Sequence, residues 1–293
     1  MFPNLLPLCM QLVDFKDVAE KYSVIFFDAF GVLKNSEGIL PDIQQTFDWM
    51  RKQGKEFYVL TNDASRGPQE LAESYYRQGF YAITPDRIIS SGMLAREYLD
   101  LKVHHGTVAY LGTASSAHYL ETADLRTMPI SEVDLKDVAD INALVLLDDE
   151  GFDWNTDLKK TVNLLRKRNI PVIVANTDAT YPVSKTRIAI AIGAVAKMIE
   201  GIVGKKFIRF GKPDAQLFMF AYERVQAVAP SITKRDVLMV GDTLTTDILG
   251  GNKFGLDTVL VLTGNTQPED AEVLIRSTGI IPTYVCESVV SGM

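Results

Sequence analysis

The fold of this chain is decided by the stretch Val24-Ile25-Phe26-Phe27-Asp28-Ala29-Phe30-Gly31-Val32-Leu33. Its first four residues are apolar and rich in β-branched and aromatic types, which predicts a buried strand. The strand ends at the carboxylate of Asp28, and Gly31 then lets the backbone turn sharply. In open α/β sheets, ligands bind outside the carboxyl ends of the strands. Asp28 is therefore a candidate catalytic residue, although aspartate also favours turns for structural reasons alone.

Strands and helices alternate along the chain after this stretch, which predicts a parallel sheet with right-handed crossovers. A helix that Pro41 opens presents Ile43, Phe47 and Met50 on one face, and Gly54 is a natural stop. Further strands are expected at residues 57–60, 88–90, 237–240, 258–262 and 283–285. The sequence therefore predicts an α/β fold.

A second alternating series begins near Gly92, with strands predicted at residues 108–111, 143–147 and 172–175 and a helix around Val162. Another helix is expected from Arg187 to Glu200, closed by Gly201. We interpret this middle third as a small α/β domain inserted into the first. The predicted domains are residues 1–91 with residues 206–293, and residues 92–205.

Composition excludes several classes of protein. Of 293 residues, 47% are apolar and 23% are charged, which is the balance of an ordinary globular protein long enough for two domains. The net charge of −7 argues against non-specific binding to nucleic acid or anionic membranes. No apolar run is long enough to span a membrane, and residues 1–13 lack the features of a signal peptide. Cys9 and Cys286 are too few for a disulfide scaffold, so a cytoplasmic location is expected.

Four predicted strand ends carry side chains that together suit phosphoryl transfer. The carboxylate of Asp28 is a potential nucleophile, the Thr61 hydroxyl with nearby amides can hold a phosphoryl oxygen, and Lys212 supplies a compact positive charge. Asp28 and Asp242 offer the hard oxygen ligands that Mg²⁺ prefers, and Asp247 could anchor the metal's waters or orient Lys212. Taken singly, each residue also fits a turn, a surface position or a helix cap.

In combination, these residues resemble the four motifs of the haloacid dehalogenase (HAD) superfamily. The motifs are Asp28-Ala29-Phe30-Gly31-Val32-Leu33, Leu60-Thr61-Asn62, Gly211-Lys212-Pro213, and Gly241-Asp242-Thr243 with Asp247. Other stretches resemble its class IIA branch, which includes nitrophenyl-, phosphoglycolate, pyridoxal-phosphate and proposed sugar phosphatases. They are Asn176-Thr177-Asp178, Tyr181-Pro182 and the run from Gly255 to Gly264. The resemblance covers nearly the whole chain from Tyr22.

The resemblance implies a Rossmann-like parallel-sheet core with an inserted α/β cap. It also implies a Mg²⁺-dependent phosphatase that hydrolyses a small organic phosphomonoester, such as a sugar phosphate, through an aspartyl-phosphate. The implied catalytic residues are Asp28, Thr61 and Lys212. The implied metal ligands and their neighbours are Asp28, the carbonyl of Phe30, Asp242 and Asp247. Caps of this branch often pack against each other, so the resemblance leaves a homodimer open.

Residues of the cap are expected to select the leaving group. The candidate substrate-binding residues are Asn62, Asn176, Asp178 and Tyr181, of which the last three fit a pocket or a plain loop equally well. An acidic run in the same third misses the spacing of a calcium-binding loop, so a solvated loop is expected at Asp148, Asp149, Glu150 and Asp153.

Phe30 departs from the phosphatase pattern. Typical phosphatases of this superfamily carry a second aspartate at this position, which acts as general acid and base; such help is worth about 10²–10⁴ in rate. The dehalogenases of the superfamily have an aromatic residue there, but they need no metal and have a helical cap elsewhere. Asp242, Asp247 and the α/β cap favour phosphate chemistry. Three alternatives stay open: a leaving group that needs no acid, an acid from the cap, or a weakly catalytic phosphate-binding protein.

Overall fold

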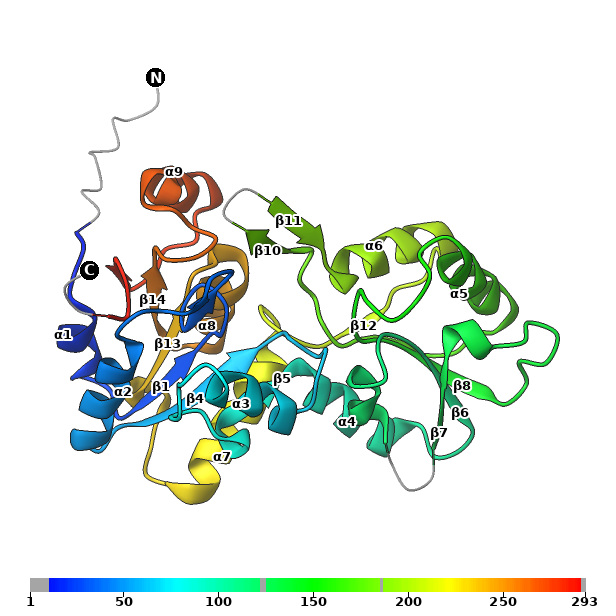
Figure 1. The fold of residues 1–293 in the computed structure, drawn as a ribbon, viewed down its shortest axis with the longest axis horizontal. Coiled ribbons are helices and arrows are strands. Elements are labelled where there is room, and N and C mark those ends of the chain that lie inside the picture. Colours follow the sequence, from blue (N-terminus) through cyan, green and yellow to red (C-terminus); the bar gives the residue numbers. More distant parts are fainter. Residues whose placement is uncertain (1–10, 122–124, 185–186, 291–293) are drawn as a thin grey trace. The chain divides into compact units, whose positions relative to one another are not determined.

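The computed structural model describes residues 11–121, 125–184 and 187–290 (Figure 1). Cys9 and most of the segment tested for a signal peptide lie outside these residues. The chain divides into two compact units. The first unit comprises Met1–Leu60, Gln78–Ala82 and Ala221–Met293, and the second comprises Thr61–Arg77 and Ile83–Phe220. The domain limits proposed from the sequence, after residues 91 and 205, stay a prediction.

The first unit contains a parallel sheet in the strand order β15-β14-β13-β1-β4. The strands are β1 (Val24–Phe27), β4 (Glu56–Thr61), β13 (Val237–Gly241), β14 (Asp257–Val261) and β15 (Tyr284–Cys286). All four residues of β1 are buried, as their apolar run predicts. Phe27 lies opposite Val240 of β13 on one side and Val59 of β4 on the other. The stretch that opens the sequence motif is therefore an inner strand of this sheet.

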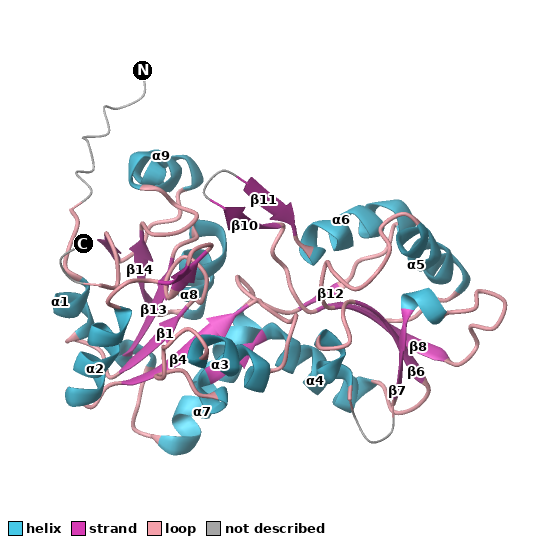
Figure 2. Cartoon of the chain, viewed as in Figure 1, coloured by secondary structure: helices cyan, strands magenta, loops and turns pink. Residues whose placement is uncertain are grey.

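Helices and short elements complete the first unit (Figure 2). They are α1 (Phe15–Ala19), the β2–β3 hairpin (Lys34–Asn35 and Gly38–Ile39), α2 (Ile43–Lys52), a 3₁₀ turn (Lys234–Asp236), a π-helical turn (Leu244–Ile248), α8 (Leu249–Phe254) and α9 (Pro268–Thr278). The expected face of α2 is buried. On that face the Phe47 ring lies 5.3 Å from Phe27, 4.8 Å from Phe57 and 5.0 Å from Phe80, measured between ring centroids. Each buried aromatic ring contributes about 1.5–3 kcal/mol, so this cluster fixes α2 against β1.

The second unit contains its own parallel sheet, in the order β12-β9-β8-β6-β7. Its strands are β6 (Thr107–Leu111), β7 (Arg126–Pro129), β8 (Ile141–Leu146), β9 (Val172–Val174) and β12 (Ile208–Arg209). Its other elements are α3 (Pro68–Tyr76), β5 (Ile88–Ser90), α4 (Ser91–Lys102), α5 (Thr156–Lys167), the hairpin β10 (Thr180–Ser184) and β11 (Arg187–Ile190), α6 (Ile192–Val203) and the first residues of α7 (Ala215–Val228). Short 3₁₀ turns lie at Pro85–Arg87, Ser116–Leu120 and Ile130–Glu132. The predicted α/β character of the middle of the chain is confirmed.

The helix predicted from Arg187 to Glu200 is wrong at both ends. Its first four residues form β11, which pairs antiparallel with β10, and the helix α6 begins at Ile192. Pairing with β10 supplies hydrogen bonds that outweigh the local preference for helix. Gly201 does not end α6, because the helix continues to Val203 and ends at Gly204, which has a positive φ of 66°.

Within the described residues, no helix combines the length and the apolar character that crossing a membrane requires.

Candidate active site

Two of the predicted carboxylates stand at neighbouring strand ends in the first unit. Asp28 follows β1 and Asp242 follows β13, and these strands are adjacent and parallel. The amide N–H of Asp28 donates to the carbonyl oxygen of Val240 at 2.8 Å, which continues the strand pairing up to the site. Because parallel strands end at the same edge of a sheet, the pairing itself brings the two side chains together.

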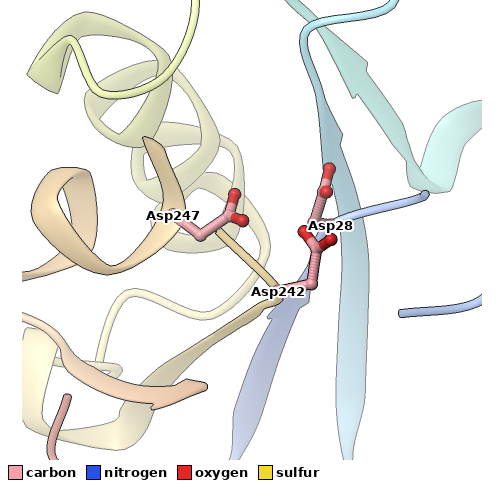
Figure 3. A group of neighbouring side chains, drawn as sticks. All are labelled: Asp28, Asp242 and Asp247. Carbon is pink, nitrogen blue, oxygen red and sulfur yellow. The ribbon is translucent and has the colours of Figure 1, made fainter. Parts of the chain in front are cut away.

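Asp247 joins them from the π-helical turn that follows β13 (Figure 3). Each of the three aspartates offers a carboxylate oxygen, and these oxygens lie within 4.8 Å of one another. Asp242 and Asp247 are fully buried, whereas Asp28 is half-buried. Oδ2 of Asp247 accepts a hydrogen bond from the amide of Thr243 at 3.1 Å, so the turn is fixed to the strand end.

Two glycines make room for the carboxylate of Asp242. Gly31 has a φ of 82°, and a Cβ at Gly31 or at Gly264 would clash with the Asp242 carboxylate. Only glycine fits at such a position, because the left-handed backbone and the close approach both exclude a side chain. The amide of Asn265 donates to Oδ2 of Asp242 at 2.5 Å, and the Thr243 hydroxyl donates to Oδ1 at 2.9 Å. The main-chain turn that contains Phe30 and Gly31 therefore packs closely against the Asp242 side chain.

The pKa of Asp242 is raised well above its ordinary value. Burial is the main cause, followed by the charges of Asp247 and Asp28. Such a group stabilises a bound cation, because a cation offsets both the desolvation and the mutual repulsion of the carboxylates. Carboxylate oxygens are the ligands of hard divalent cations, and the donor set fits such an ion. This group of three aspartates is the candidate metal centre.

In the second unit, the side chain of Asn62 pairs with the main chain of Lys212. The amide N–H of Lys212 donates to Oδ1 of Asn62 at 2.7 Å, and Nδ2 of Asn62 donates to the Lys212 carbonyl at 3.1 Å. Both residues are 2% exposed. Asn62 was predicted to bind substrate, but its carboxamide is engaged with Lys212 and with Asp178, whose Oδ1 accepts from Nδ2 at 2.9 Å. The backbone amide of Asn62 stays the proposed contact to a phosphoryl group.

The remaining predicted residues of this unit lie in turns. The Thr61 hydroxyl is nearly buried and accepts from the amide of Asp63 at 3.1 Å. Oδ1 of Asn176 accepts from the amide of Asp178 at 2.9 Å, which closes a turn after β9. That hydrogen bond gives Asn176 a structural role in the turn.

Tyr181 contacts the acidic run. Its hydroxyl donates to Oδ2 of Asp149 at 3.1 Å, and burial with the Asp149 charge raises the pKa of Tyr181 to about 12. Asp148 and Asp149 lie in a loop, as expected, but they are half-buried rather than fully exposed. Burial and the charges of Asp149 and Asp63 raise the pKa of Asp148 to about 6. Asp148 therefore gains and loses a proton close to neutral pH.

Sequence reasoning missed two hydroxyl residues of this region. The Thr177 hydroxyl donates to the carbonyl of Lys212 at 2.7 Å, and the Ser91 hydroxyl donates to the carbonyls of Asn62, at 3.0 Å, and Ala175. Both are common residue types, and although Thr177 lies in the quoted stretch Asn176-Thr177-Asp178, nothing in that stretch gave its hydroxyl a role. Only their partners, far away in the chain, identify them.

Two regions of the chain match sequence-family models of known proteins. A sequence-family model described as haloacid dehalogenase-like hydrolase matches residues 25–126, and a second one, described as HAD-hydrolase-like, matches residues 209–291. Chronophin from Mus musculus is 28% identical over 285 residues, covering 95% of this chain and 94% of chronophin.

Solved structures of phosphatases are similar to this chain over most of its length. A crystal structure from Cytophaga hutchinsonii described as a possible sugar phosphatase of the HAD superfamily is 61% identical, with a TM-score of 0.93, covering 97% of this chain and 100% of that one. A glycerol phosphate phosphatase from Mycobacterium tuberculosis, in complex with calcium, is 25% identical, with a TM-score of 0.76, covering 94% of this chain and 75% of that one.

The raised pKa of Asp242 predicts a specific pH dependence of stability in the absence of metal. The unfolded chain titrates this group at about 3.9. Its folded pKa is higher, so the stabilisation is fully present below about pH 3.9 and is lost as the pH rises through the folded pKa. In EDTA between pH 5 and pH 8, we expect the melting temperature of the wild type to fall relative to that of Asp242→Asn. Asp270→Asn, at an exposed carboxyl of α9, is the control; a wild-type curve parallel to Asp242→Asn would contradict the prediction.

The buried pairing of Asn62 predicts a large cost for Asn62→Asp. The variant loses the Nδ2 donor and leaves acceptors at Lys212 and Asp178 without it, which costs about 2–4 kcal/mol of unfolding free energy. Chemical denaturation followed by circular dichroism measures the loss. Asn163→Asp is the matched control, because Asn163 is exposed and donates to the carbonyl of Lys159 within α5. Equal effects of the two variants would show that the Lys212 pairing contributes nothing special.

Proposed function

Because the chain belongs to the haloacid dehalogenase-like hydrolase family, we propose that it is a phosphatase that hydrolyses a small organic phosphomonoester with the help of Mg²⁺. The observation that carries the proposal is the group of Asp28, Asp242 and Asp247 at the strand ends of the first unit. The named phosphatases among the relatives support the reaction class. The 61% identical structure, described as a possible sugar phosphatase, favours a sugar phosphate or a similar ester as the substrate.

Asp28 is the proposed nucleophile. Its carboxylate oxygen attacks the phosphorus atom, the bond from phosphorus to the ester oxygen breaks, and the ester oxygen takes a proton from water or an acidic side chain as the alcohol leaves. Water then attacks the aspartyl-phosphate, which releases inorganic phosphate and restores the carboxylate. Asp28 suits this role because it is only half-buried at a strand end, whereas Asp242 and Asp247 are fully buried.

Thr61, Lys212 and the amide of Asn62 are the proposed phosphoryl-binding groups. The lysine charge offsets the negative charge of the phosphoryl oxygens, and the hydroxyl and the amide donate hydrogen bonds to them. Fixed donors stabilise the transition state more than mobile ones do, because they need no reorganisation during the reaction. The buried main chain of Lys212 supports such a fixed role.

Asp28, Asp242 and the carbonyl of Phe30 are the proposed ligands of Mg²⁺, with Asp247 beside them. When bound, the ion neutralises charge on the phosphoryl group and on the three carboxylates. Magnesium commonly uses only one or two carboxylates together with waters and substrate, which this donor set allows. The calcium in the Mycobacterium tuberculosis phosphatase shows that a relative holds a divalent cation.

Phe30 favours one alternative function, a phosphate-binding protein with weak catalysis. A phenylalanine side chain cannot transfer a proton, so position 30 lacks the acid that assists departure of the alcohol. A metal-independent dehalogenase is disfavoured, because the three grouped carboxylates are suited to a cation. Activity measurements separate the three functions.

Asp28→Asn tests the proposed function. On a panel of phosphate esters with MgCl₂, we expect kcat to fall at least about 10³-fold, because the amide cannot form the aspartyl-phosphate. Asp270→Asn makes the same change at an exposed carboxyl of the same unit and is expected to leave kcat unchanged. EDTA is expected to abolish wild-type turnover. No turnover on any ester, with phosphate compounds still raising the melting temperature, would support the binding protein. Halide release from a halogenated organic acid in EDTA would support the dehalogenase.

Phe30→Asp tests whether the missing acid limits the rate. If it does, kcat on esters with poor leaving groups rises about 10-fold or more, while esters of good leaving groups such as p-nitrophenol change little. The matched variant for an acid from the middle of the chain is Asp148→Asn, because the pKa of Asp148, about 6, suits proton donation near neutral pH. An unchanged rate in Phe30→Asp would contradict the idea that the missing acid limits the rate. An unchanged rate in Asp148→Asn would contradict Asp148 as the source of the proton.

A further inference from the structure

We propose that Thr177 is a positioning residue that holds the main chain of Lys212, together with Asn62, where the phosphoryl group is bound. The proposal rests on the proposed phosphatase function and deepens it. It gives a role to Thr177, which lies in the stretch Asn176-Thr177-Asp178 of the family resemblance but has no function assigned there. All the contacts that carry it lie within the second unit.

The carbonyl oxygen of Lys212 accepts two hydrogen bonds from side chains. Thr177 Oγ1 donates to it at 2.7 Å and Asn62 Nδ2 donates at 3.1 Å, while the amide of Lys212 donates to Asn62 Oδ1 at 2.7 Å. Nδ2 of Asn62 also lies 3.2 Å from Thr177 Oγ1, so the two side chains contact each other as well. Both main-chain polar groups of Lys212 are therefore fixed from the side, as in a strand pairing, although Lys212 belongs to no strand.

Thr177 is itself held from two directions. The Ser91 hydroxyl ties the carbonyl of Asn62 to that of Ala175, two residues before Thr177. On the other side, the first turn of α6 packs so closely that a Cβ at Gly193 would clash with the main chain of Thr177 and Asp178. The main chain at Thr177 is therefore fixed by contacts that do not involve Lys212.

This arrangement matters for catalysis because Lys212 acts through a point charge. The interaction of a charge with phosphoryl oxygens depends steeply on distance at low dielectric, and a displacement of about 1 Å can cost about 10²-fold in rate. The flexible side chain of a lysine begins at its Cα, so the position of the main chain limits where the ammonium group can lie. A hydroxyl that fixes this main chain affects the reaction without touching the substrate.

The test compares the variants Thr177→Val and Thr177→Ser. Valine keeps the shape and removes the donor, whereas serine keeps the donor. The matched control is Thr161→Val in α5, because the Thr161 hydroxyl is buried and donates to the carbonyl of Asp157 in the same unit. Two quantities are measured: kcat on p-nitrophenyl phosphate with MgCl₂, and the Kd of inorganic phosphate by titration calorimetry.

We expect Thr177→Val to lower kcat and to raise the Kd of phosphate, each about 10-fold or more, with an unchanged number of binding sites. Thr177→Ser and Thr161→Val are expected to stay within about 2-fold of the wild type. A merely structural role would lower the number of competent molecules but would leave Kd unchanged. Equal Kd values in Thr177→Val and Thr161→Val would overturn the proposal.

A second pair of variants tests the contact from α6. Gly193→Ala pushes against Thr177 and is expected to weaken phosphate binding, whereas Gly201→Ala in the same helix adds a methyl group into open space and is not. Equal phosphate affinity in both alanine variants would argue against the proposed support of Thr177.

Failure of the proposed function is recognised separately. If the wild type hydrolyses no ester, the phosphatase proposal fails, and the calorimetric titration alone decides the role of Thr177. Weaker phosphate binding in Thr177→Val, but not in Thr161→Val, would then still support it. A wild type that neither hydrolyses esters nor binds phosphate would overturn both proposals.

Discussion

Mutual repulsion among three aspartates is the constraint around which the first unit is built. Their oxygens lie within 4.8 Å of one another, and two of the side chains are fully buried. Strand pairing brings Asp28 and Asp242 together, because β1 and β13 are adjacent and parallel and each is followed directly by one of these aspartates. Burial, followed by the repulsion from Asp247 and Asp28, raises the pKa of Asp242 and makes the group a good site for a cation. Gly31 and Gly264 pack against the Asp242 carboxylate, where a Cβ atom would clash with it.

In the second unit, hydrogen bonds fix the main chain of the buried residue Lys212. Asn62 and Thr177 bind both main-chain polar groups of Lys212, the amide N–H and the carbonyl. Each hydrogen bond contributes only about 1 kcal/mol net, but leaving a buried carbonyl or amide without one costs more. The main chain of Lys212 is thus held in place by the free-energy cost of breaking these hydrogen bonds.

Strong local patterns made much of the fold predictable. The apolar run before Asp28 is the buried strand β1, and the predicted face of α2 is buried against it. The family, the α/β fold and the phosphatase class predicted from the motifs are confirmed by the comparisons. The helix predicted from Arg187 failed because β10, a partner that sequence periodicity does not reveal, pairs with its first residues. The half-buried state of Asp148 and Asp149 was missed for a similar reason, since burial depends on what packs against a loop.

The sequence by itself determined which chemical groups stand at the ends of strands: Asp28, Thr61 and Asp242 come at the ends of continuous apolar runs with the length and composition of a buried strand. Only the tertiary structure decided that Asn62 pairs with the main chain of Lys212 and that Thr177 joins it. Those partners are separated by 150 and 35 residues. Hydrogen bonds between such distant residues leave no periodic trace in a sequence, because they depend on where the folded chain brings two side chains rather than on their spacing.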